Sequence, residues 1–337
     1  MGIIIYLFDE AKADLQKFES KSNLFFNIRF NIIAGIIVGL ALGSIDIFLN
    51  KLSNKKRSFR FHIIIKSILY ISVFVIVLSL VIFRAATIFY ETILQLPFGQ
   101  EEAGSFRQII LALIIYSILV SILISFISEV NKKFGPGVLI RLLLGKYYKP
   151  RVEERIFMFL DLKSSTTIAE KLGHIKYSQL IQDCFNDLNI SASKLKAEIY
   201  QYAGDEAVLT WTLDKGLKNT NYLKFYFDFQ NRIINRSEYY KNNYDLVPEF
   251  KAGVNGGIIT AAEVGEIKRE IAYHGDVINT AARIQGVCNT YNQKLLVSEF
   301  LAEKLNTASD YISKEIGSIS LKGKKFPVNV FSVELQS

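Results

Sequence analysis

Three long apolar segments near the N-terminus constrain the fold more than any other feature of this sequence. They cover residues 28–49, 63–83 and 109–127, and the third contains no charged residue. A helix of about 20 apolar residues crosses the ~30 Å hydrocarbon core of a bilayer. We therefore predict a membrane domain over residues 1–130 with three transmembrane helices. The alternative for this set is a group of buried helices in a large soluble protein.

Basic residues are distributed unequally between the connections. The 50–62 connection carries Lys51, Lys55, Lys56, Arg57 and Arg60, whereas the 91–106 connection carries three glutamates and no Lys or Arg. Because cytoplasmic loops are enriched in Lys and Arg, the first connection and the C-terminal half are expected in the cytoplasm. The net charge of +8 also fits nucleic-acid binding, but its placement beside the apolar segments favours membrane topology, and we expect no nucleic-acid partner. Whether residues 1–8 end a fourth span is left open.

The pattern changes after a linker that we place at residues 131–154. Gly135-Pro136-Gly137 interrupts the third apolar helix, and the simplest role for the linker is a tether. Residues 155–337 alternate strand-like and helix-like segments, with hairpins among the strands. This order predicts an α+β domain with a central mixed sheet and flanking helices, following the α-helical membrane domain.

Two aspartates in this second domain stand at positions suited to metal binding. Asp161 ends a buried strand, and Asp205 lies in a Gly-Asp turn that joins two further strands as a hairpin. Each alone is typical of a cap or a solvated turn. Together they supply hard oxygen ligands of the kind that Mg²⁺ or Mn²⁺ prefers.

A polar helix face adds a third element. Asn279 and Arg283 are four residues apart and therefore share one face of the predicted helix. An amide beside a guanidinium suits a ribose oxygen and a phosphate on which charge builds up. The basic turn at residues 321–327 is either a triphosphate clamp or a solvated loop.

The segments FLDLKSST, YAGDEA and YHGDVINTAARIQ, in this order and spacing, resemble the catalytic domain of class III nucleotidyl cyclases. Membrane-anchored adenylate cyclases of bacteria are the most similar type. The resemblance covers roughly residues 155–335. It implies a ferredoxin-like mixed sheet, a homodimer with active sites at the interface, and location in the bacterial inner membrane with a cytoplasmic catalytic domain.

The resemblance also implies roles for single residues. Asp161 and Asp205 would bind two Mg²⁺ or Mn²⁺ ions with help from the Leu162 carbonyl. Asn279 and Arg283 of the other subunit would orient the ribose and stabilise the transition state. The remaining substrate contacts would be Lys251 on a phosphate and Lys324 on the triphosphate, although any lysine of 322–325 fits the latter position.

The positions that read the base depart from the family pattern. Adenylate cyclases usually carry Lys four residues before the second metal-binding Asp, and Asp or Thr three residues before the motif Gly. Here these positions are Gln201 and Ala272. A carboxamide both donates and accepts, so Gln201 can pair with adenine N1 and N6 or with a guanine edge. ATP is favoured because it is the common substrate, and other nucleoside triphosphates stay open.

Three other interpretations of the second domain are open. The first is a guanylate cyclase or another nucleotide cyclase. A diguanylate cyclase shares the Asp strand and a similar hairpin, but this chain has Ala203 and Ala207 where that family has Gly and Phe. A degenerate cyclase domain that dimerises and senses is the third, and the presence of all four polar site residues speaks against it.

Overall fold

The computed structural model describes residues 138–305, 310–320 and 327–336, with isolated residues and short stretches between 36 and 135. The chain divides into two compact units, 1–134 and 135–337. Most residues of the predicted spans 28–49 and 63–83 lie outside the described set, and the described residues of the third span (109–127), from 115 onward, are helical. Among the residues that are described, no helix combines the length and apolar character needed to cross a bilayer.

An eight-stranded mixed sheet forms the centre of the second unit. Seven strands follow the order β2-β3-β1-β4-β6-β8-β7, and β5 pairs with β4. The β4–β6 pair is parallel and the other pairs are antiparallel. The strands are β1 (Arg151–Leu162), β2 (Glu198–Ala203), β3 (Glu206–Thr212), β4 (Phe250–Val264), β5 (Glu270–His274), β6 (Leu295–Ser298), β7 (Tyr311–Ile319) and β8 (Val328–Leu335).

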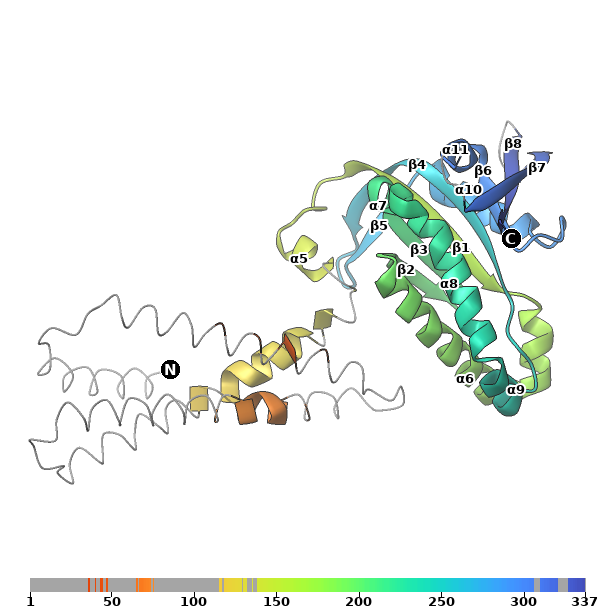
Figure 1. Cartoon of the computed structure of the whole chain (residues 1–337). Coiled ribbons are helices and arrows are strands. Elements are labelled where there is room, and N and C mark those ends of the chain that lie inside the picture. Colours follow the sequence, from red (N-terminus) through yellow and green to blue (C-terminus); the bar gives the residue numbers. More distant parts are fainter. Residues whose placement is uncertain are drawn as a thin grey trace, which may run out of the picture. The chain divides into compact units, whose positions relative to one another are not determined.

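Helices lie in several of the connections between these strands (Figure 1). The longest, α6, bends at Gly173, where φ is +73°. Arg236 separates α8 from α9. The helices are α5 (Val138–Leu143), α6 (Ser165–Lys194), α7 (Leu213–Leu217), α8 (Asn221–Asn235), α9 (Ser237–Tyr244), α10 (Asp276–Val287) and α11 (Glu299–Glu303), with a 3-10 turn at Lys218–Thr220.

The order β1-α6-β2-β3-α8-β4, with β1 between β3 and β4, is the ferredoxin-like arrangement. The main core lies between the sheet and helices α6 and α8, with Trp211, Phe225 and Phe229 among its fully buried side chains. Both faces of β1 are covered: Ile156, Met158, Leu160 and Leu162 lie in this core, whereas Phe157 between them belongs to a second cluster. The amphipathic periodicity of α8 directs its apolar face to the same core. The prediction of an α+β domain with a mixed sheet and flanking helices is confirmed.

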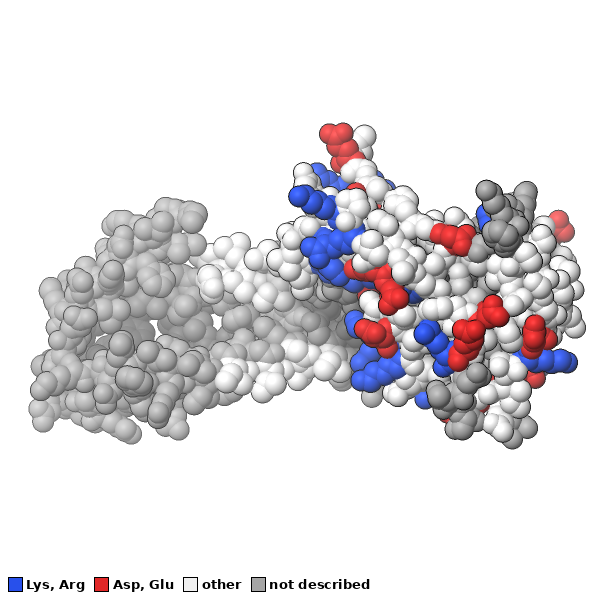
Figure 2. All heavy atoms as spheres, turned by 90° about the horizontal axis from the view of Figure 1, so that it is seen from above, with Lys and Arg blue, Asp and Glu red and all other residues white. Residues whose placement is uncertain are grey.

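Residues immediately before β1 belong to this unit. Tyr147 is fully buried, and its carbonyl accepts a hydrogen bond of 2.8 Å from the Glu263 amide of β4. The predicted linker (131–154) therefore overlaps helix α5, this buried tyrosine and the start of β1. Figure 2 shows acidic and basic side chains close together on the face that it presents, so that face carries no continuous surface of one charge in its described part.

The opposite face of the sheet holds a second apolar cluster, which includes Phe157, Tyr273 and Ala281. Helix α10 packs against β4 at this face, and Gly253 permits its close approach. A Cβ at residue 253 would lie 2.5 Å from Gln285 Cα and 2.7 Å from the Ala281 carbonyl oxygen. Only a residue without a side chain fits between this strand and this helix.

Replacing this glycine is therefore expected to separate α10 from β4. We expect Gly253→Ala to lower the free energy of unfolding by about 1–3 kcal/mol, the usual cost of overpacking. Urea unfolding followed by the fluorescence of Trp211, the only tryptophan of the chain, measures this change. Gly286→Ala on α10 is the matched control, because a Cβ there meets nothing within 4 Å. Equal stability of Gly253→Ala and the parent protein would contradict the close packing.

Candidate active site

The structure brings the two predicted metal-binding aspartates together. Asp161 lies near the end of β1, in register with Glu206, the first residue of β3. Asp205 occupies the two-residue turn between β2 and β3, where Gly204 adopts φ +65°. Burial, followed by the neighbouring charge and hydrogen bond of Asp205, raises the pKa of Asp161 to about 6. Burial and the adjacent Asp205 carboxylate therefore both disfavour the ionised form of Asp161.

This arrangement fits a divalent cation. A bound cation relieves the repulsion between two adjacent carboxylates, and Mg²⁺ in proteins is commonly held by one or two carboxylates together with substrate phosphates. Within the described residues, no group of three or more His, Cys, Asp and Glu side chains is arranged to hold a metal alone. The acid pair is thus the type of site that a nucleotide's phosphates complete. Leu162, whose carbonyl is a further predicted ligand, has its side chain in the core.

Helix α10 contacts the acid pair through a residue that sequence reasoning missed. The Gln285 amide donates a hydrogen bond of 3.3 Å from Nε2 to Oδ2 of Asp161. Asn279 and Arg283 lie on the same helix, where Asn279 is exposed and Arg283 is partly exposed. The predicted transition-state residues and the contact to Asp161 therefore belong to a single helix.

Two lysines were predicted to contact phosphates. Lys251 lies on β4 in register with Asp161, is nearly buried, and donates a hydrogen bond to the Asn289 side chain. Its position beside the acid pair is compatible with a phosphate contact, which stays a prediction. Lys324 lies in the 321–326 segment, outside the described residues.

The two positions predicted to read the base lie on different strands. An extra residue, Tyr200, interrupts the pairing of β2 with β3 just before Gln201, which is exposed. Ala272 lies on β5 opposite Ala262. The rings of Tyr200 and Tyr273, the neighbours of these two positions, meet edge to face with their centroids 5.0 Å apart. This aromatic pair links β2 to β5.

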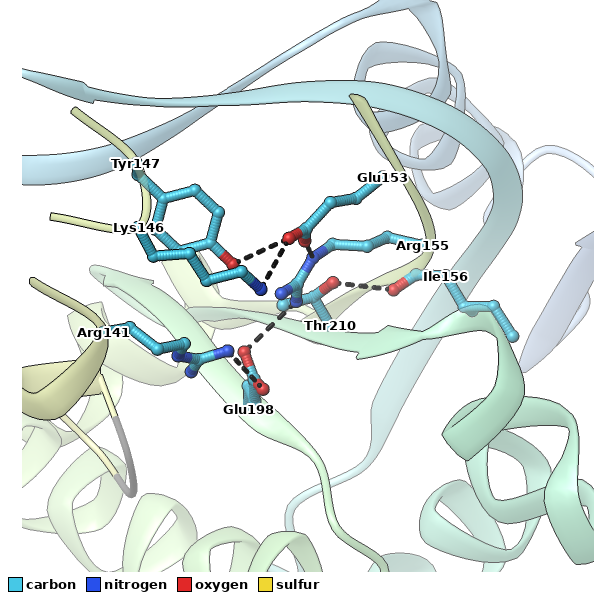
Figure 3. A network of polar contacts seen from close by, with 8 residues as sticks. All are labelled: Arg141, Lys146, Tyr147, Glu153, Arg155, Ile156, Glu198 and Thr210. Atoms are coloured by element: carbon cyan, nitrogen blue, oxygen red, sulfur yellow. Dashed lines mark hydrogen bonds and ion pairs between the residues drawn. The ribbon is translucent and has the colours of Figure 1, made fainter. Parts of the chain in front are cut away.

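A network of charged residues surrounds the buried Arg155 (Figure 3). Arg155 of β1 is fully buried, and its guanidinium carbon lies 4.8 Å from the centroid of the Tyr273 ring. Its Nε donates to Glu153 at 2.9 Å, and its Nη1 donates to Glu198 of β2 at 3.1 Å. These charge-assisted bonds connect β1 to β2 and are stronger than neutral hydrogen bonds.

The segment before β1 joins the same network. Arg141 of α5 donates to Glu198 at 3.1 Å, and Lys146 and the Tyr147 hydroxyl both donate to Glu153 at 3.0 Å (Figure 3). Burial disfavours ionisation of Glu198, but the positive charges of Arg155 and Arg141 outweigh it and lower its pKa. Both glutamates are thus held ionised between cations from two parts of the chain.

Sequence reasoning did not identify two residues, Arg155 and Tyr177. Tyr177 lies near the acid pair, because burial and the charge of Asp205 raise the pKa of its hydroxyl. A signal for Arg155 was available: Glu153 and Arg155 are two apart in a strand and so share one face. Nothing in the sequence marks Gln285, because its contact depends on how α10 packs over β1 and β4.

The described residues combine a ferredoxin-like sheet with an acid pair at the end of β1 and an adjoining helix that carries Asn279 and Arg283. Residues 147–334 match the family described as the adenylate and guanylate cyclase catalytic domain. The match covers more than half of the chain. The chain belongs to this family.

Known proteins with similar sequences are adenylate cyclases by name. "Adenylate cyclase 2" of Rhizobium meliloti is 32% identical over 223 residues, which cover 66% of this chain and 61% of that protein. The terminal-differentiation-specific adenylate cyclase of Dictyostelium discoideum is 31% identical over 87 residues, covering 25% of this chain and 4% of that protein. This chain therefore spans about three fifths of the first of these relatives.

Solved structures support the fold. The adenylyl cyclase CyaB from P. aeruginosa has a TM-score of 0.50 at 16% identity, covering 56% of this chain and 97% of that one. A bacterial light-regulated adenylyl cyclase has a TM-score of 0.56 at 17% identity, covering 65% and 64% of the two chains. At these identities the likeness concerns the fold alone.

The charge network yields a prediction for stability. Glu198→Gln leaves Arg155 with one carboxylate partner fewer, and we expect a loss of about 2 kcal/mol at pH 7, a typical value for a hydrogen bond to a charged group. Because the pKa of Glu198 is lowered in the folded state, its contribution is present above the unfolded-state pKa and disappears as pH falls through the folded-state pKa.

Urea unfolding of the variant and the parent protein at pH 7, and at pH values falling below about 4, measures both effects. The difference in unfolding free energy should shrink toward the acid end. Glu154→Gln, at an exposed position of β1, is the control and should stay within about 0.5 kcal/mol of the parent. A difference that grows on acidification would refute this assignment.

Proposed function

We propose that this chain is a membrane-bound adenylate cyclase that converts ATP to 3′,5′-cyclic AMP and pyrophosphate for intracellular signalling. The observation that carries the proposal is the contact between Asp161 and Asp205 in a chain of the cyclase family. The adenylate cyclase names of the two relatives support ATP as the substrate.

The roles follow from the chemistry of each side chain. Asp161 and Asp205 hold two Mg²⁺ or Mn²⁺ ions, with the Leu162 carbonyl as an additional ligand. When bound, these ions lower the pKa of the ribose 3′-hydroxyl and neutralise charge on the phosphates. Lys251 and Lys324 bind the phosphates, and the Gln201 amide pairs with the edge of the base above Ala272.

The active unit is proposed to be a homodimer. In one chain the contact from α10 to the acid pair is made by Gln285, whereas Asn279 is exposed on the same helix. An exposed Asn279 with Arg283 one turn further is suited to reach the nucleotide held by a second copy. Arg283 then stabilises the charge that develops as pyrophosphate leaves, and Asn279 orients the ribose.

The direct test uses the purified chain with Mn²⁺ and each of ATP, GTP, CTP and UTP, with products separated by chromatography. Cyclic AMP from ATP is the expected result, and chelation of the cation should abolish it. A larger yield from GTP would make the chain a guanylate cyclase. No cyclic product from any nucleotide would identify a degenerate domain.

Removal of one acid tests the metal assignment. Asp205→Asn is expected to lower kcat by at least about 100-fold, because the neutral amide is a weak cation ligand. Asp214→Asn, at an exposed position on α7, is the matched control and should retain the parental rate. Parental activity of Asp205→Asn would exclude the two-metal assignment.

Anchoring in the bacterial inner membrane, with the catalytic domain in the cytoplasm, is proposed from the apolar segments 28–49, 63–83 and 109–127 and their flanking charges. The expressed chain should sediment with membranes and resist extraction by alkaline carbonate, which removes peripheral proteins. Lysines of the 50–62 connection should react with membrane-impermeant reagents only after the cells are opened. Release of the whole chain by carbonate would contradict the anchoring.

A further inference from the structure

We propose that Gln285 is a positioning residue for the acid pair, whose side-chain amide holds the Asp161 carboxylate in the orientation in which it binds the cation with Asp205. The inference deepens the proposed function, because it concerns the same site. It assigns a task to a residue for which the sequence offered none.

The contact between Gln285 and Asp161 is a hydrogen bond in which the amide donates and the carboxylate accepts. Gln285 Nε2 donates to Oδ2 of Asp161 at 3.3 Å. The hydrogen bond fixes one oxygen of the carboxyl group on the side of α10, so the group does not rotate freely. A carboxylate held in one orientation presents its oxygens to a cation in a defined direction.

The chemical type of the residue matters. Lys or Arg at this position would neutralise the carboxylate and repel an incoming cation, and Glu would add a further negative charge beside two acids. An amide donates a hydrogen bond without either effect. Groups that hydrogen-bond to metal ligands in this way fix the orientation of the ligand, and their removal typically weakens metal binding about 10–100-fold.

Helix α10 is fixed at several points, so the amide is held in place. Gly253 of β4 admits the backbone of Gln285 itself at van der Waals contact. The Asn255 side chain of β4 donates to the Val277 carbonyl at 3.1 Å near the start of the helix, and Lys251 bonds to Asn289 just beyond its end. Strand β4 therefore holds both ends and the middle of α10.

The fixed position of α10 also applies to Asn279 and Arg283, the proposed transition-state residues, because they lie on the same helix as Gln285. Arg283 is two residues before Gln285 on the same fixed helix. The orientation of Asp161 and the placement of Arg283 consequently depend on a single rigid element. A change at Gln285 that spares the helix should disturb cation binding and leave the Arg283 contribution intact.

The test measures Mn²⁺ binding to the full chain by electron paramagnetic resonance in the presence of 3′-deoxy-ATP, whose phosphates complete the site and which lacks the hydroxyl needed for cyclisation. Gln285→Met keeps the length of the side chain and removes the donor, and we expect a dissociation constant about 10-fold higher than that of the parent. In steady-state assays the Mn²⁺ concentration for half-maximal rate should rise similarly. The kcat at saturating Mn²⁺ should change less than threefold, because Arg283 is undisturbed.

Gln230→Met is the matched control. Gln230 on α8 donates a hydrogen bond of 2.8 Å to the Phe250 carbonyl, so the same substitution removes a structural amide contact from a different site. It should leave Mn²⁺ affinity unchanged. Gln285→Asn, which keeps the amide but shortens its reach, should weaken Mn²⁺ binding as Gln285→Met does, and it replaces that variant if the latter does not fold.

Parental Mn²⁺ affinity in folded Gln285→Met or Gln285→Asn would overturn the inference and leave the proposed function standing. A parent protein that binds Mn²⁺ in a Gln285-dependent manner but forms no cyclic nucleotide would support the inference and refute the proposed function. A parent protein that binds no Mn²⁺ would overturn both.

Discussion

The buried guanidinium of Arg155 is the interaction on which the arrangement of this domain depends. It places a permanent positive charge inside the fold, and such a charge is tolerated only with hydrogen-bonded partners of opposite sign. Glu153 and Glu198 supply them from β1 and β2, while the ring of Tyr273 covers the charge from β5. Three strands are thereby held together where van der Waals packing alone would leave their relative position less defined. Because α5 contributes Arg141 to the same glutamate, the residues before β1 are fixed by the same charges.

A second electrostatic relation, this time unfavourable, characterises the other end of β1. Burial, together with the neighbouring Asp205 carboxylate, raises the pKa of Asp161 to about 6, so the fold maintains a repulsion that a cation relieves. The charges at the two ends of β1 are thus balanced differently. At one end, Glu153 and Glu198 neutralise Arg155 within the chain. At the other end, the negative charges of Asp161 and Asp205 repel each other. This contrast distinguishes a structural cluster of charged residues from a candidate catalytic one, although both are partly buried and both contain acids.

Much of this domain could be predicted from residue patterns because the relevant interactions are local. The hairpin of Gly204 and Asp205, the strand that ends at Asp161 and the helix of Asn279 are each defined by a few neighbouring residues. The contact of Gln285 with Asp161 and that of Arg155 with Glu198 could not be found in this way, since they join residues 124 and 43 positions apart in the sequence. The extra residue at Tyr200 was missed, because a strand pattern does not reveal one unpaired residue.

The close packing at Gly253 has a consequence for how this site changes shape. Strand β4 and helix α10 leave no space between them into which either can slide, so they move only together, as one block. Asp161 is on β1, which pairs with β4 along twelve residues and therefore belongs to that block. Asp205 is tied to the same block, because the next residue, Glu206, pairs with Asp161 across β3 and β1. The separation of the two acids is accordingly set by the backbone register of neighbouring strands.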